Sequence, residues 1–523
     1  MIQALASRLA EPGTATDVPI AAMDETNPST FVTNWNGWSG QSRDAVARLN
    51  VHTYGTGDRM VARDVAKSSD KPLWMSEVGG DWDGTGFNLT NIDNGLGLAT
   101  RIVDDLRELE PSAWVFWQPV EDLYNMEKVE NLNWGSVFID FDCNADGDSE
   151  RRLADGDADP SCGVSTNATY NTARNFTHYI EPGDRLIPTN DGQTTAAVAA
   201  EGDGAAIVHV NDGDEERAVT LDLSLFGNIE AGATVTPIVT TESPASDTTA
   251  NALVSGAAVA VDPSTGSATL TVPAKSVTTF VVNGVSGVAA EAPAFRDGDS
   301  VQLQGIQSGK PLTVDGDAVV IDSVDTSTAG VAAQSWTVHG VSGEGSQRQH
   351  VALESGDSTF LALDGTSVVM ADATLAEALA DESLQWIPTT TDGSTFALVS
   401  AADARVLDVN GQSSADGAGV GSWTSNGGGN QRWSLEAVPE VEDPGTDPEP
   451  EPSDGVPSTD DPPIYSRFEP LADPGASAAN YFQPYWFDSD GRHIQAHGGQ
   501  IVSVTAEQAG RRLGGRRRRR GGR

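Results

Sequence analysis

Short apolar runs alternate with longer stretches of mixed polarity over residues 1–135. Each run ends in a polar or aromatic residue, and each stretch between two runs is long enough to hold a helix. This alternation predicts parallel strands joined by helices. We expect the strands at 18–23, 49–54, 72–77 and 113–118. They amount to half of a closed (β/α)8 barrel, whose chemistry lies at the carboxyl ends of its strands.

The pattern changes further along the chain. From 184 to 290, short alternating strands are separated by Gly, Asp and Asn turns, which predicts a β-sandwich. From 296 to 438, three weak repeats of about 45 residues end at Trp336, Trp386 and Trp433, each one or two positions after a Gln. This threefold repeat indicates a β-trefoil.

The expected fold is therefore multi-domain, with a partial (β/α)8 barrel at 1–183 that supplies the last four strands. The β-sandwich and the β-trefoil follow, and an acidic, Pro-rich linker occupies 439–463. Residues 464–505 have the composition of a folded domain, and the Arg-rich stretch 506–523 is expected to be unstructured. A chain of 523 residues suits three or four domains at roughly 100–200 residues each.

The net charge of the chain excludes some classes of binding partner. Asp and Glu number 76 against 31 Lys and Arg, which gives a net charge of −45. Such a surface repels nucleic acid and anionic membranes and suits a soluble, monomeric, secreted protein. No apolar run is long enough to cross a membrane, and the first residues do not form a signal peptide. Cys143 and Cys162 are compatible with one disulfide, which would indicate an oxidising compartment, or with two free thiols.

One expected strand end carries a candidate nucleophile. Glu77 ends an apolar run, and Gly79 and Gly80 then allow the chain to turn away. His52 and Tyr54, two positions apart, project from one face of the preceding strand. Trp117 and Gln118 end the strand that follows. A retaining glycosidase needs an ionised carboxylate of this kind, flanked by groups that hold a sugar, although an acidic residue at a strand end also commonly has a structural role.

Several segments resemble a known family. Residues 50–55, 71–80 and 114–119, with 23–28 and 175–183, are similar to the later strands of glycoside hydrolase family 30, above all to its endo-β-1,6-galactanase branch. The resemblance covers 1–285, including the β-sandwich. It implies that Glu77 is the nucleophile and that His52, Tyr54, Trp117 and Gln118 bind substrate. The implied substrate is β-1,6-galactan in arabinogalactan, with xylan and glucosylceramide as alternatives within the family.

The chain also departs from that family. The resemblance implies an acid/base Glu in an Asn-Glu-Pro segment after the fourth strand, and this motif does not occur here. Residues 18–23 correspond to the fifth strand. We therefore expect a truncated chain that lacks the first four strands, the acid/base and the parent's signal peptide. Glu25 and Glu121 are the nearest substitutes, but they lie on other strands, so an inactive or poorly folding piece of an extracellular enzyme is expected.

An acidic loop carries the first half of a calcium motif. Asp142, Asn144 and Asp146 have the spacing of calcium ligands, and Gly147 follows them. The twelfth position, which should be a bidentate Glu, is Leu153. A solvated acidic loop without metal is therefore the favoured interpretation, and calcium the alternative.

The three repeats resemble the ricin-type lectin β-trefoil, whose pockets combine an Asp, an aromatic platform, and Asn and Gln side chains near the closing Trp. The third repeat alone carries this set, and the resemblance assigns four sugar ligands: Asp408, Trp423, Asn426 and Asn430. Gln431 and Trp433 recur in each repeat and are expected in the core. The other two repeats lack the Asp, at 311–314 and 360–363. The alternatives are a trefoil that acts only as a spacer, and a chain whose one working part is the lectin.

The end of the chain has a different character. Residues 486–499 resemble the opening of a glycoside hydrolase family 43 domain, with too few residues for one propeller blade. Arg511, Arg512 and the five arginines at 516–520 then dominate. We interpret 506–523 as the product of a frameshift, with a basic tail for nucleic acid or heparin as the alternative.

Overall fold

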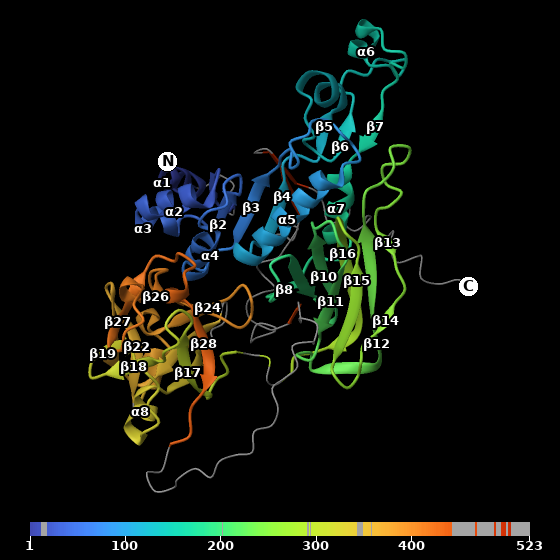
Figure 1. Ribbon diagram of the computed structural model, residues 1–523. Coiled ribbons are helices and arrows are strands. Elements are labelled where there is room, and N and C mark those ends of the chain that lie inside the picture. Colours follow the sequence, from blue (N-terminus) through green and yellow to red (C-terminus); the bar gives the residue numbers. More distant parts are fainter. Residues whose placement is uncertain are drawn as a thin grey trace.

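The computed structural model describes residues 1–11, 18–200, 202–289, 292, 294–341, 349–356 and 358–441, and the backbone of four short strands after them. Figure 1 shows three neighbouring parts: an α/β part in blue, a β part in green and a second β part in yellow and orange. The expectations for 439–463, 464–505 and 506–523 fall almost entirely outside the described residues.

The first part is a four-stranded parallel sheet in the order β1-β2-β3-β4. Its strands are β1 (Ala21–Glu25), β2 (Arg48–His52), β3 (Leu73–Val78) and β4 (Ala113–Phe116). Its helices are α1 (Ile2–Leu9), α2 (Pro28–Gly37), α3 (Gly40–Asp44), α4 (Arg59–Ser68) and α5 (Ile92–Glu108). The sheet, α2 and α4 share an apolar core that includes Phe31, Leu49, Val51, Leu73 and Met75.

All four strands differ in at least one boundary from the ranges expected, and β3 does so by a single residue. Pairing of β1 starts at Ala21 rather than 18, since Pro19 has no N–H for the ladder. β2 ends at His52 and β4 at Phe116, so Tyr54, Trp117 and Gln118 lie in the loops that follow. Loop backbone can turn its side chains over the sheet edge, which is where a ligand would meet them.

A protruding segment follows β4 and reaches the far tip of the molecule at α6 (Figure 1). Its elements are β5 (Val120–Asp122), the π-helix η1 (Asn125–Glu130), β6 (Val137–Ile139), α6 (Glu150–Asp155) and β7 (Val164–Thr166). Leu123, Met126 and Phe138 form its small core. Helix α7 (Ala168–Thr177) then returns the chain to α5, where Thr172 Oγ1 donates to the Gly95 carbonyl at 2.9 Å.

The second part consists of two packed sheets. One has the order β13-β12-β16-β10-β9-β8, with β14 beside β12, and the other pairs β15 with β11. The strands are β8 (Arg185–Ile187), β9 (Thr194–Val198), β10 (Asp203–Asn211), β11 (Arg217–Asp222), β12 (Asn228–Thr240), β13 (Val254–Ser255), β14 (Val259–Ala260), β15 (Ser267–Val272) and β16 (Ser276–Ser286).

The larger of these sheets is buried on both faces. Ile207 and Phe280 point into the core between the two sheets, whereas Val208, Val210 and Val277 pack against α5 and α7. This double burial explains why β10 is apolar almost throughout instead of alternating. The second part is therefore fixed to the helices of the first.

The third part closes by pairing its first strand, β17, with its last, β28. Its strands are β17 (Ser300–Gly305), β18 (Leu312–Asp315), β19 (Ala318–Ile321), β20 (Trp336–Val341), β21 (His350–Glu354), β22 (Thr359–Asp364), β23 (Ser367–Asp372), β24 (Trp386–Thr389), β25 (Ala397–Ser400), β26 (Val406–Val409), β27 (Ala418–Trp423) and β28 (Trp433–Ala437). Its short helices are α8 (Thr328–Ala333), α9 (Leu375–Ala378) and the 3-10 turns η2 (Glu382–Leu384), η3 (Asn410–Gln412) and η4 (Gly429–Gln431). The three repeated tryptophans are fully buried together at its centre.

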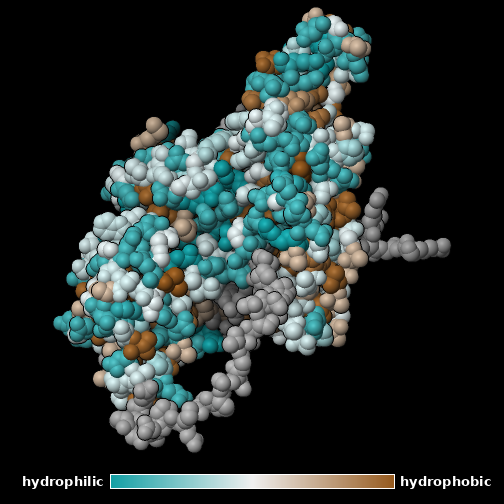
Figure 2. Space-filling view, viewed as in Figure 1, coloured by the Kyte–Doolittle hydropathy of each residue, from teal (hydrophilic) through white to brown (hydrophobic). Residues whose placement is uncertain are grey.

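Among the described residues, no helix has the length and apolarity needed to cross a membrane. The face in Figure 2 is largely hydrophilic, with hydrophobic residues scattered over it. Beyond 441, the described backbone comprises β29 (Ser466–Arg467), β30 (Trp486–Phe487), β31 (His493–His497) and β32 (Gln500–Ser503).

Candidate functional site

Glu77 lies near the end of β3, where two side chains that follow or end β2 meet it. The Tyr54 hydroxyl donates to Glu77 Oε1 at 2.9 Å, and His52 Nδ1 lies 3.8 Å from the same oxygen. The strand register pairs His52 with Glu77. The three side chains thus form one cluster, as expected for the carboxyl ends of adjacent parallel strands. The Glu77 side chain is 25% exposed, which leaves room for a ligand to reach it.

Tyr54 acts toward Glu77 as a neutral donor. Burial, followed by the hydrogen bond to the carboxylate, raises the pKa of Tyr54 well above its ordinary value. The phenol therefore keeps its proton at neutral pH. A fixed O–H donor of this kind holds one carboxylate oxygen and leaves the other for chemistry.

Asp24 extends this cluster across a third strand. Its Oδ1 accepts hydrogen bonds from Ser76 Oγ at 2.6 Å and from His52 Nε2 at 3.1 Å. The β1–β2 register skips Asp24 between Met23 and Glu25, and its φ of 63° lies in the left-handed region. Bulges of this kind redirect a side chain. The hydrogen bond from His52 is the largest cause that lowers the pKa of Asp24, so Asp24 is a carboxylate at neutral pH.

Trp117 and Gln118 approach from the other side of β3. The Trp117 carbonyl passes so close to Gly79 that a Cβ there would lie 1.6 Å from its oxygen, which explains the glycine after the strand. The Gln118 amide donates to Glu121 Oε1 at 2.9 Å. Gln118 is thus joined to Glu121, whereas Tyr54 and His52 approach Glu77 directly.

The two glutamates considered as substitutes for an acid/base each have an amide partner. Glu25 Oε1 accepts from Asn34 Nδ2 at 2.6 Å, and Glu121 accepts from Gln118. The cluster around Glu77 therefore has the form of one oriented glutamate beside a phenol and an imidazole, with the Asp24 carboxylate at the other nitrogen of that imidazole. Such a group can attack an anomeric carbon, and the complete retaining reaction also needs a second carboxyl group.

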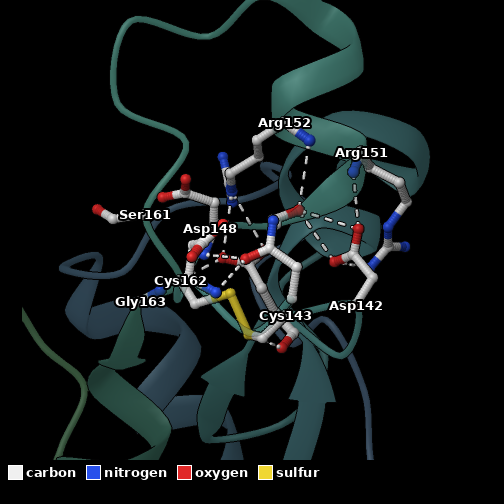
Figure 3. The surroundings of a disulfide bond; sticks show 12 residues. Asp142, Cys143, Asp148, Arg151, Arg152, Ser161, Cys162 and Gly163 are labelled. Atoms are coloured by element: carbon white, nitrogen blue, oxygen red, sulfur yellow. Dashed lines mark hydrogen bonds and ion pairs between the residues drawn. A yellow bond between two sulfur atoms is a disulfide. The ribbon is translucent and has the colours of Figure 1, made fainter.

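The acidic loop holds its own carboxylates with protein groups (Figure 3). Asp142 accepts from Ser149 Oγ at 2.9 Å, from the Arg151 backbone N–H at 2.7 Å and from the Arg151 guanidinium at 3.0 Å. Asn144 Oδ1 accepts from the backbone N–H groups of Asp146 and Asp148. Within the described ranges, no group of three or more His, Cys, Asp or Glu side chains is placed to hold a metal ion.

Of the two alternatives for the cysteines, the structure has the disulfide. Cys143 and Cys162 are bonded across 19 positions of this loop (Figure 3). Beside it, Arg152 pairs with the buried Asp140 at 3.2 Å. The disulfide and the arginines thus give a protruding segment with little apolar core its cross-links.

In the third repeat, Asp408 lies at the centre of a polar cluster, which is the candidate sugar pocket. Its Oδ2 accepts from Asn430 Nδ2 at 2.7 Å and from Gln431 Nε2 at 2.8 Å. Asp408 is opposite Gly421 in the β26–β27 ladder, and Trp423 is two positions further on the same face. The Trp423 side chain is 61% exposed, as a stacking platform must be. Burial raises the pKa of Asp408.

Two side chains near Asp408 make contacts that the sequence did not predict. Gln431 is buried, as expected of a core residue, but its amide also contacts Asp408. Its repetition in all three repeats concealed this role. The Asn426 side chain accepts from the Gly428 N–H at 2.7 Å and so shapes its own turn, while Asp408 contacts Asn430 and Gln431.

One family model and two curated proteins are similar to parts of this chain. The ricin-type beta-trefoil lectin domain-like family matches residues 382–443. An exo-beta-1,6-galactobiohydrolase of Bifidobacterium longum subsp. longum is 34% identical over 465 residues, which is 81% of this chain and 31% of that protein. An endo-beta-1,6-galactanase of Hypocrea rufa is 27% identical over 207 residues, 39% of this chain and 36% of that protein. The chain thus spans about a third of the length of these curated relatives.

Among solved structures, a GH30 endoxylanase from Clostridium papyrosolvens C71 is 19% identical, with a TM-score of 0.36 over 54% of this chain and 60% of that chain. The chain is thus similar to two hydrolases whose names state action on β-1,6-linked galactose, and its residues 382–443 match the ricin-type lectin model.

Proposed function

We propose that this chain carries the nucleophile half of a retaining glycosidase site for β-1,6-galactan, together with a sugar-binding pocket in its third trefoil repeat. The observation that carries the proposal is Glu77 at a strand end, held by Tyr54 at 2.9 Å and flanked by His52. We take the four parallel strands to be the last four of a (β/α)8 barrel. The names of two relatives, which state action on β-1,6-linked galactose, support galactan over xylan or glucosylceramide.

In this proposal, Glu77 attacks the anomeric carbon and the bond to the leaving oxygen breaks. Leaving oxygens of a polysaccharide need a proton from an acid, which is worth about 10²–10⁴-fold in rate. The family's Asn-Glu-Pro acid/base motif is not in this sequence. We therefore expect slow hydrolysis of galactan by this chain, but a reactive nucleophile.

Leaving groups that need no proton separate these two properties. A 2,4-dinitrophenyl β-galactoside expels dinitrophenolate unaided, so Glu77 can form the galactosyl–enzyme ester without an acid. We expect intact-mass spectrometry to detect one added galactosyl group on the purified chain, and peptide mapping to place it on Glu77. Added azide should release it as β-galactosyl azide.

The matched variants are Glu77→Gln and Glu121→Gln, because both change a glutamate carboxylate to the amide of the same shape. Only Glu77→Gln should abolish labelling. Labelling that survives Glu77→Gln would refute the assignment of the nucleophile. Rapid hydrolysis of galactan by the unmodified chain would instead refute the expected lack of an acid/base.

A second candidate function is a carbohydrate-binding protein that has no hydrolytic role. The arrangement of Asp408, Asn430 and Gln431 favours it, since these side chains present a carboxylate and amides beside an exposed Trp423. Galactose binding that is lost in Asp408→Ala, with no labelling at Glu77, would favour this function over the first.

We also propose an extracellular location for the protein. Its support is the disulfide between Cys143 and Cys162, because disulfides persist mainly in oxidising compartments. Thiol alkylation of the protein from culture fluid should leave both cysteines unlabelled until a reductant is added. Labelling without reductant would contradict the proposal.

A further inference from the structure

The trefoil is docked along one helix of the α/β part. Arg63 Nη2, on α4, donates to Thr389 Oγ1 at 3.0 Å. Near the end of the same helix, Ser68 Oγ donates to the Ala401 carbonyl at 3.2 Å. On α5, Arg107 Nη2 donates to the Thr391 carbonyl at 3.4 Å. Figure 1 shows the orange strands β24 and β26 below α4.

The contact between α4 and the trefoil is buried, and both polar and apolar side chains take part in it. The Arg63 side chain is 3% exposed and its other partners, Asp64 and Glu110, lie on the α/β side at 3.0 and 3.2 Å. Ala404 of the trefoil packs against the apolar core of the sheet. A buried guanidinium with partners on both sides fixes the relative orientation, since any rotation would leave a desolvated charge unpaired.

The order of contacts along α4 shows which end of the helix lies beside the pocket of the third repeat. Ser68 and Ala401 meet at the end of the helix, whereas Met60, in its first turn, lies beside Gly427. Gly427 belongs to the loop that ends in Asn430. The pocket of the third repeat therefore lies toward the beginning of α4.

In a parallel β/α unit, a helix begins on the side where the preceding strand ends. β2 ends at His52, and α4 begins at Arg59. The beginning of α4 is thus on the same side as Glu77, and the trefoil pocket shares that side. Had the trefoil docked in the reverse direction, its pocket would lie at the opposite end of the sheet.

Chain length sets an upper limit on the separation. Tyr54, which contacts Glu77, is six positions before Met60, and a peptide spans at most about 3.6 Å per residue, or roughly 22 Å here. The side chains and loop residues that lead on from Met60 to Asp408 bring the limit to roughly 40 Å. A ligand held at one site is then at an effective concentration on the order of millimolar at the other.

We propose that the third-repeat pocket and the cluster around Glu77 bind one and the same galactan chain, as two subsites of one rigid unit. This rests on the proposed function of both sites. The pocket is then more than a tether to bulk polysaccharide, because its fixed position selects substrates long enough to reach both sites. Short sugars bind each site separately and weakly, and long chains bind both at once.

A double-mutant cycle tests the proposal, with Glu77→Gln as the background so that the polymer stays intact. Asp408→Ala removes the trefoil site, Trp117→Ala weakens the barrel site, and Asp364→Ala, an exposed carboxylate of the second repeat, is the matched control. Binding of β-1,6-galactobiose and of β-1,6-galactan is measured by titration calorimetry for each variant.

With galactobiose, each variant should lose one of two independent sites and leave the affinity of the other unchanged. With galactan, either variant alone should lower the affinity by roughly 10²-fold or more, down to that of the one remaining site, and the double variant should show no specific binding. Asp364→Ala should change neither.

Galactan affinity that responds to only one of the two variants, losses that are independent on galactan as on galactobiose, or no galactan binding at all would each overturn the proposal. These outcomes are separate from the labelling of Glu77, because no bond is broken in the calorimetric measurement. Bridged binding without labelling at Glu77 would therefore refute the proposed catalysis but support the shared galactan chain.

Discussion

Replacing Arg63 with Met should weaken the junction between α4 and the trefoil. Arg63 pairs with Asp64, which is fully buried, and donates to Thr389 across the junction. The methionine fills much of the volume but leaves the Asp64 carboxylate buried without its counterion. Removing one partner of such a pair costs about 3–5 kcal/mol. Lys67 still pairs with Glu110 at 2.5 Å, so the loss should be concentrated at Asp64.

The stability of this junction has to be measured at the junction itself, because a chain with several cores does not unfold in one step. Native-state hydrogen exchange of α4 and β24 reports the free energy of opening this junction. A loss of 3–5 kcal/mol corresponds to an exchange rate raised about 10²- to 10³·⁵-fold. The double variant Arg63→Met, Asp64→Asn should recover most of the loss, since it removes both charges. Lys128→Met, at a pair 37% exposed on the protruding segment, should cost at most about 1 kcal/mol.

The destabilisation caused by Arg63→Met should also depend on pH, in a direction set by Asp64. Burial raises the pKa of Asp64 above its ordinary value. A carboxyl group with a raised pKa in the folded state favours folding below its unfolded pKa and loses that contribution as the pH rises through the folded value. The Arg63→Met penalty should therefore be larger at pH 8 than at pH 4. An equal penalty at both values, or no gain from Asp64→Asn, would refute the account of a buried, unpaired charge.

Three further predictions concern the other parts. Gly79→Ala should remove labelling of Glu77 and destabilise the sheet, since the new Cβ would lie 1.6 Å from the Trp117 oxygen; Gly37→Ala, with no atom within 4 Å, is its control, and equal effects would contradict the prediction. Reducing the disulfide, which closes a loop of 19 positions, should destabilise the protruding segment by roughly 3 kcal/mol; hydrogen exchange should rise there but not in the trefoil. Because the pKa of Asp24 is lowered, its contact with His52 should persist above the ordinary Asp pKa and be lost only as the pH falls through the lower value; loss of the His52–Asp24 NMR contact near pH 5 would refute this.

The sequence alone determined which side chains gather at the end of the parallel sheet. Glu77, His52 and Tyr54 end or follow neighbouring apolar strands, and side chains in such positions converge whatever the rest of the chain does. The same holds for the tryptophans that close each repeat. Their spacing predicts one common core, and all three are fully buried. Local periodicity suffices here, because it records which face of an element is withdrawn from water.

The tertiary structure decided the contacts that join distant segments. Asp24 reaches His52 and Ser76 because a bulge turns its side chain across the strands, and no local pattern marks that bulge. Gln431 is buried, as expected, and its amide also reaches Asp408. Residue 63 meets residue 389 only because the trefoil docks on α4. Such contacts depend on how whole surfaces fit together, and local sequence patterns do not record that fit. The same fit sets the direction in which Asp408 and Trp423 of the third repeat face.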